Sequence, residues 1–130
     1  MDTQYNLNNG KLKIKCDALD ISFTDIDVSS VTPIIQSNMQ ELVNQTTTIV
    51  LDSVDDILLN NMQNLLKRYL NYIEDNLQQK FLPAIISCEI IEKNHHIDLD
   101  ECVLLSVNYL DDASKIELVV RPLDITVKNI

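Results

Sequence analysis

The stretch Lys11-Leu12-Lys13-Ile14-Lys15-Cys16 alternates a charged and an apolar side chain at every step. Successive side chains of a β-strand point to opposite faces, so this pattern predicts a strand with one buried face and one lysine-covered face. The alternation resumes over residues 19–24 and then continues on the opposite parity from Ile26, which indicates a bulge or bend near Asp25. The Asp17–Ala18 step fits either a turn between two strands or one long strand.

A first helix is expected to begin near Pro33. Proline suits the first helical position, and Thr32 before it can act as a cap. Apolar residues then recur at helical spacing as far as Val43. The following segment, Thr46-Thr47-Thr48-Ile49-Val50, is β-branched throughout, which weakens a helix. We interpret it as a break or a distorted turn, with a short strand as the alternative.

A second and longer helix is predicted over residues 53–81. Asp52 or Ser53 can cap it, and Pro83 ends it. Its apolar residues form one stripe at three- and four-residue steps, from Val54 to Phe81. About 28 residues span roughly 42 Å, so this helix needs a long surface to pack on.

The remaining residues are typical of antiparallel strands. Strands are expected over residues 84–92, 103–109, 115–121 and 123–127, with turns at 92–96 and 111–114. Pro122 indicates that the last strand lies at an edge or bends sharply. The fold class predicted for residues 1–130 is therefore a single α+β domain, in which a curved antiparallel sheet packs against one long and one shorter helix.

Composition excludes several classes of function. The chain carries 20 Asp+Glu against 10 Lys+Arg, a formal net charge of −10, which is the wrong sign for a nucleic-acid-binding protein. No apolar stretch approaches the roughly 20 residues of a transmembrane helix, and the polar N-terminus does not resemble a signal peptide. Three widely spaced cysteines fit a reducing compartment, so we expect synthesis in a bacterial cytoplasm.

The densest group of polar residues is His95-His96-Ile97-Asp98-Leu99-Asp100-Glu101-Cys102. Imidazole, carboxylate and thiolate are all metal ligands. However, adjacent histidines on a strand point to opposite faces, and the spacing matches no known metal signature. We favour a solvated hairpin turn, and we predict neither a metal nor another cofactor. The chain also lacks a phosphate-binding glycine loop and a nucleophile motif, so we expect no catalytic residues and no enzyme activity.

Two basic groups are candidates for binding a partner or a lipid headgroup. Lys11, Lys13 and Lys15 form a positive stripe on one face of their strand. Lysines also discourage pairing at an edge strand, and we favour that explanation of the stripe. The second group lies on the long helix and consists of Lys67, Arg68, Tyr69 and Tyr72. Such a group is more often a solvated helix face beside a core tyrosine.

The order of elements resembles the OrfX proteins, which are encoded beside clostridial-type neurotoxin genes. The resemblance runs from residues 8–15 into residues 19–23, through Pro33 and a long amphipathic helix, to a final strand meander. It covers roughly the whole chain, whose length is similar to that of the smallest member of that family. The OrfX fold is in turn similar to that of tubular lipid-binding (TULIP) proteins, in which a long helix packs along a curved antiparallel sheet.

The resemblance implies an accessory protein without catalysis that binds a larger OrfX-type partner. It also implies lipid or phosphoinositide binding and release from the cell without a signal peptide. No site residues carry over, because no motif is matched. The alternative is a small acidic secretion chaperone acting as a homodimer, although such chaperones commonly begin with a helix. A third hypothesis is an enzyme subunit with its site at His95 and His96, which would require a bound metal.

Overall fold

The structure is a computed structural model that describes residues 2–35, 46–52, 55–75, 85–110 and 115–129. Seven strands, one short 3₁₀ turn (η1) and one α-helix (α2) occur in these residues. Their bounds, in chain order, are β1 Asp2–Cys16, η1 Asp17–Leu19, β2 Ile21–Ile35, β3 Thr47–Leu51, α2 Asp56–Asp75, β4 Ile86–Ile91, β5 His95–Leu110, β6 Lys115–Pro122 and β7 Ile125–Asn129.

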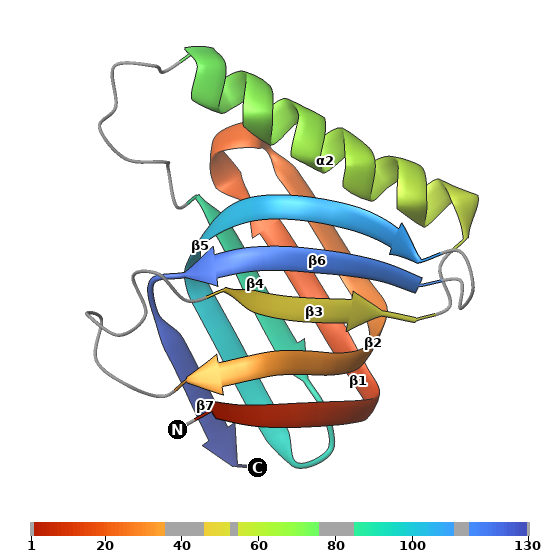
Figure 1. Cartoon of the computed structure of the whole chain (residues 1–130), viewed down its shortest axis with the longest axis vertical. Helices are drawn as coiled ribbons and strands as arrows, with labels where there is room; N and C mark the ends of the chain where they lie inside the picture. Colours follow the sequence, from red (N-terminus) through yellow and green to blue (C-terminus); the bar gives the residue numbers. More distant parts are fainter. Residues whose placement is uncertain (1, 36–45, 53–54, 76–84, 111–114, 130) are drawn as a thin grey trace.

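The strands form one antiparallel sheet that closes into a six-stranded barrel. The strand order is β4-β1-β2-β3-β6-β5-β7, and β4 also pairs with β5, which closes the ring. The strands bend strongly, so that β3 and β6 cross in front of β1 and β4 (Figure 1). The 16-residue strand β5 makes closure feasible, because its first half pairs with β4 and its second half pairs with β6.

Bulges in β1 and β2 produce much of this bending. Leu12 pairs with Ile26 whereas Ile14 pairs with Phe23, so two residues of β2 face one residue of β1 there. Asp25, inside this bulge, has a left-handed φ of 57°. A larger irregularity between Asn6 and Gly10 turns Leu7 into the core. Bulges increase the local twist of a sheet, which is what a barrel of few strands needs.

The barrel interior is filled by aliphatic side chains. Every second residue of β3, β4, β6 and the 10–16 part of β1 is buried, as the alternation in these segments predicts. The largest fully buried side chains of the strands are Leu7, Leu12, Ile14, Ile49, Leu51, Ile86, Ile90 and Ile97.

Helix α2 lies over β5 at one end of the barrel (Figure 1). Asp55 caps it, because its Oδ1 accepts a hydrogen bond of 2.8 Å from the Leu58 backbone N–H. Met62, Leu65 and Tyr69 are buried at three- and four-residue steps, whereas Ile57 and Leu70 on other faces are exposed. The helix thus covers part of β5 beyond the segment that pairs with β4.

The predicted α+β class is wrong, because the chain is mostly β and its sheet closes into a barrel. The predicted TULIP-like arrangement, a sheet packed against two helices, is wrong for the same reason. The first predicted helix is also contradicted at its start, since Pro33–Ile35 belong to β2. Pro33 lies just beyond Thr32, which pairs with Thr48 of β3, at a position where β2 has only one neighbouring strand. A missing N–H is tolerated there. The rest of that predicted helix, residues 36–45, lies outside the described residues.

Most of the other elements agree with their predictions. The segment 46–50 is a strand, the alternative left open above, and the Asp17–Ala18 step is a turn. The long helix is confirmed over Asp56–Asp75, and residues 76–84 lie outside the described residues, as does the predicted turn at 111–114. β7 follows Pro122 and, among the described strands, pairs only with β5, so it lies at an edge as expected. None of the described helical residues forms a segment long and apolar enough to cross a membrane.

Candidate functional site

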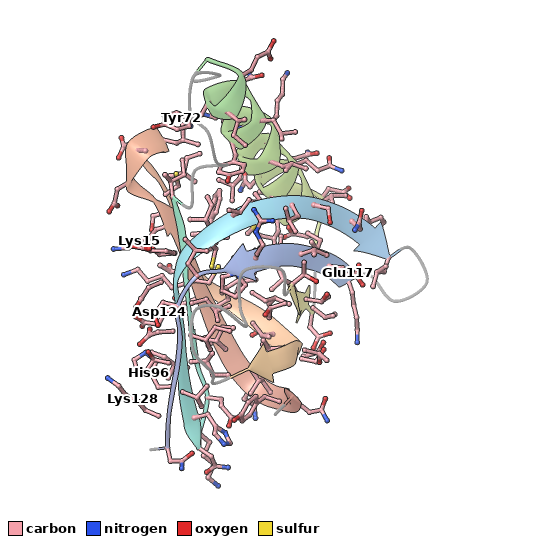
Figure 2. The ribbon with its side chains drawn as sticks, turned by 60° about the vertical axis from the view of Figure 1, so that its left-hand side comes forward. Lys15, Tyr72, His96, Glu117, Asp124 and Lys128 are labelled. Carbon is pink, nitrogen blue, oxygen red and sulfur yellow. The ribbon has the colours of Figure 1, made fainter. Side chains whose placement is uncertain are left out.

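The outer surface of β1, β4 and β5 carries charged side chains in neighbouring rows. We call this surface the charged face and define it by Lys13, Lys15, Ser87, Glu89, His96, Asp98 and Asp100. Strand alternation places all seven on the outer side of the sheet, because the residues between them are buried, namely Ile14, Cys88, Ile97 and Leu99. Lys15 and His96 project from this side, with Asp124 and Lys128 of the adjoining β7 segment (Figure 2).

The strand register determines which charges meet on the charged face. Lys13 of β1 pairs with Glu89 of β4, and Glu89 pairs on its other side with Asp98 of β5. Lys15 pairs with Ser87, whose hydroxyl donates a 2.6 Å hydrogen bond to the backbone oxygen of Asp100. Lys13 and Lys15 therefore lie on one side of β4, Asp98 and Asp100 lie on the other, and Glu89 lies between them.

A shallow cavity of about 200 Å³ opens on the charged face. It is lined by Lys13, Lys15, Ser87, Cys88, Glu89, Asp98 and Asp100. Pockets that enclose a free small molecule usually have volumes of about 300–1,000 Å³. The cavity is therefore of the size of a side chain, and its walls carry charges of both signs.

The predicted lysine stripe is present, but only one of its three lysines forms an ion pair with the described residues. Lys11 donates a hydrogen bond to Asp27 of β2, and this contact raises the pKa of Lys11. Within the described residues, Lys13 and Lys15 form no ion pair. The edge-protecting role favoured for the stripe is wrong, because this part of β1 pairs with β2 on one side and with β4 on the other.

The second predicted group, on α2, does not form one exposed surface. Tyr69 is fully buried, and burial raises its pKa to about 12. A hydrogen bond with the Leu104 backbone lowers the pKa, but by less than burial raises it. Arg68 donates a 2.8 Å hydrogen bond to the carbonyl oxygen of Leu19, next to the β1–β2 turn. Lys67 is exposed, and Tyr72 is half-buried. Arg68 and Tyr69 thus attach the helix to the barrel at two points.

The two adjacent histidines point to different surroundings, as strand geometry predicts. They lie at the start of β5 and not in a turn, because the turn comprises only Glu92–Asn94. His95 contacts Glu92 and packs edge-on against Tyr5, with ring centroids 4.8 Å apart. His96 lies on the charged face, where its Nε2 is 3.3 Å from Asp98 Oδ1 and 3.7 Å from Glu89 Oε1.

The group of His96, Glu89 and Asp98 could be predicted only in part from the sequence. The spacing of His96 and Asp98 places both on one face of a strand, but Glu89 joins them through the β4–β5 register. Their three ligand-capable atoms all lie within 4.8 Å of one another. A carboxylate–imidazole–carboxylate set of this kind can hold a divalent cation.

The three cysteines are buried, and this includes Cys88, which lines the cavity between Ser87 and Glu89. Burial raises the pKa of the Cys16 thiol, and a hydrogen bond with Cys88 together with burial raises the pKa of Cys102. These thiols therefore resist ionisation and act as small core side chains.

Comparisons with protein-family models, curated proteins and solved structures found no match for this chain. The resemblance to the OrfX proteins therefore stays a prediction from the sequence.

Proposed function

We propose that this chain is a non-enzymatic binding protein that docks on a protein partner through the charged face. The observation that carries the proposal is the pair Lys13 and Lys15, which line a side-chain-sized cavity and form no ion pair with the described residues. Two such lysines at the wall of a cavity are available to carboxylates of another molecule.

The charge pattern supports a protein partner over a purely anionic surface. Glu89, Asp98 and Asp100 face the lysines across the same cavity, and the whole chain has a net charge of −10. A membrane rich in anionic lipids would be repelled by these groups. A polypeptide can place an acidic side chain on the lysines and a basic one on Asp98 or Asp100. The larger OrfX-type protein implied by the sequence resemblance is our candidate for that partner.

The experiment measures binding of the full chain to a purified larger OrfX-type protein by calorimetry or surface plasmon resonance. We expect the double variant Lys13→Glu/Lys15→Glu to bind at least about 10-fold more weakly, mainly through slower association. Lys67→Glu is the matched control, because Lys67 is an exposed lysine of α2 outside the charged face. We expect it to bind like the unaltered chain.

Three results would contradict the proposal. One is an equal loss of affinity in Lys67→Glu, and another is unchanged affinity in the double variant. The third is Lys13-dependent binding to phosphoinositide vesicles with no binding to the protein partner. A stable homodimer that captures an unfolded client would instead support the secretion-chaperone alternative.

A further inference from the structure

We propose that Glu89, His96 and Asp98 form a binding site for a divalent transition-metal ion of the zinc class. This site was not expected from the sequence, and it does not depend on the docking of a partner. Glu89 comes from β4, whereas His96 and Asp98 come from β5.

The first support is a polar atom that the protein leaves unsatisfied. His96 Nε2 is shielded from solvent and has no hydrogen-bond partner among the described residues. Buried polar atoms are nearly always paired, so an orphan nitrogen requires an explanation. Asp98 Oδ1 lies 3.3 Å away and Glu89 Oε1 lies 3.7 Å away, yet neither makes a hydrogen bond with this nitrogen.

The two distances from His96 Nε2 are close to those between ligands of a common ion. Zinc binds imidazole nitrogen and carboxylate oxygen at about 2.0–2.2 Å, so neighbouring ligands of a tetrahedral site lie about 3.3–3.6 Å apart. The 3.3 Å distance from His96 Nε2 to Asp98 Oδ1 falls in this range. The 3.7 Å distance from His96 Nε2 to Glu89 Oε1 lies 0.1 Å beyond it. Glu89 is the most exposed of the three side chains, at 41%, so its carboxylate has the most freedom to adjust.

The charges on the strands also favour a cation at this position. Glu89 and Asp98 are direct cross-strand neighbours, and like charges in that position destabilise a sheet. Two lysines lie opposite members of the group, Lys13 opposite Glu89 and Lys128 opposite His96, but neither forms an ion pair among the described residues. A divalent ion would neutralise both carboxylates at once.

The backbone holds the three ligands in place before an ion arrives. β4 pairs with β1 and β5, and the segment of β5 that carries His96 and Asp98 pairs with β4 and β7. One imidazole with two carboxylates favours zinc and its first-row neighbours over magnesium and calcium, which prefer all-oxygen sites. Three protein ligands leave one coordination position for water or for a group from a partner.

The test titrates the metal-free full chain with Zn²⁺ by calorimetry. We expect one equivalent to bind, and we expect His96→Gln and Asp98→Asn each to weaken the affinity at least about 10-fold. His95→Gln is the matched control, because His95 is the neighbouring histidine and contacts Glu92 and Tyr5 instead. It should bind Zn²⁺ like the unaltered chain. Circular dichroism checks that the variants stay folded, which their outer-face position favours.

Two spectroscopic measurements identify the ligands directly. On addition of Zn²⁺, the ring nitrogen resonances of His96 should shift while those of His95 stay in place. Co²⁺ substituted for Zn²⁺ should give no thiolate charge-transfer band, because the three cysteines are buried and none belongs to the group of Glu89, His96 and Asp98. The proposal is overturned by a thiolate band, by absence of stoichiometric binding, or by an equal loss of affinity in His95→Gln.

Discussion

Tyr69 shows how one side chain joins the helix to the barrel. Its ring is fully buried, and its hydroxyl interacts with the Leu104 backbone of β5. A buried tyrosine hydroxyl needs such a partner, since an unpaired one would cost about 1–3 kcal/mol. The sequence indicated only that Tyr69 belongs to an amphipathic helix, because its partner lies 35 residues away, a separation that local patterns do not encode.

The raised pKa of Tyr69 predicts a loss of stability at alkaline pH. The folded protein keeps this proton up to a pKa of about 12, whereas the unfolded chain loses it at the ordinary tyrosine pKa of 10.0. Between these values the unfolded state binds fewer protons, so stability falls as pH rises. The full loss is at most about 2.7 kcal/mol.

The measurement is urea unfolding at about pH 9 and about pH 11. The pKa of Lys11 is also raised, so its contribution to stability also begins to fall near the upper end of this range, and Tyr69→Phe is therefore compared with the unaltered chain. At the lower pH, the free energy of unfolding of the phenylalanine variant should be about 1 kcal/mol smaller than that of the unaltered chain. Its free energy of unfolding should also fall less when the pH is raised. If the stability of both proteins fell equally with pH, Tyr69 would not contribute to the loss of stability at alkaline pH.

The β1–β2 hairpin shows at the level of an element how irregularities shape the barrel. Asn9 has a left-handed φ of 68° and is exposed, and Gly10 follows it at a buried position. A Cβ atom on Gly10 would lie 2.8 Å from the Cβ of Leu7, which is itself buried. The only glycine of the chain is therefore placed where the backbone approaches a core side chain.

Gly10→Ala should consequently destabilise the protein by about 1–3 kcal/mol, because the tightly packed Leu7 has little room to move. Asn9→Gly is the matched control, since glycine adopts a left-handed φ without strain, and it should be neutral or slightly stabilising. Urea unfolding midpoints of the two variants give the comparison. Equal stability of Gly10→Ala and the unaltered chain would mean that the bulge packs differently.

The elements with a clear period were predictable from sequence, and those with conflicting signals were not. The alternation around Leu12 and the three- and four-residue steps around Leu65 each identified their element correctly. Pro33 resembles the first residue of a helix as much as a residue of a singly paired strand. Two long-range features separate the interpretations: Ile34 and Ile35 pair with β1, and the pairing of β2 with β3 ends at Thr32.

At the scale of the whole molecule, the decisive event is the pairing of β4 with β5 that closes the sheet. It closes the predicted curved sheet into a barrel, and it brings Glu89 beside Asp98. Alternation predicts which face of a strand is charged, but it does not predict which strands become neighbours. The lysine row and the acidic residues could therefore be found in the sequence, whereas their meeting on the charged face could not.

The most direct test of the account is a set of NMR distance contacts around Cys88 of β4. The barrel predicts cross-strand contacts from Cys88 to Ile14 on one side and to Leu99 on the other. Both sets would establish closure and the register that builds the charged face. Contacts on one side alone would mean an open sheet, and a register shifted by one residue would turn Glu89 into the core. Either of these results would contradict the charged face and both proposals built on it.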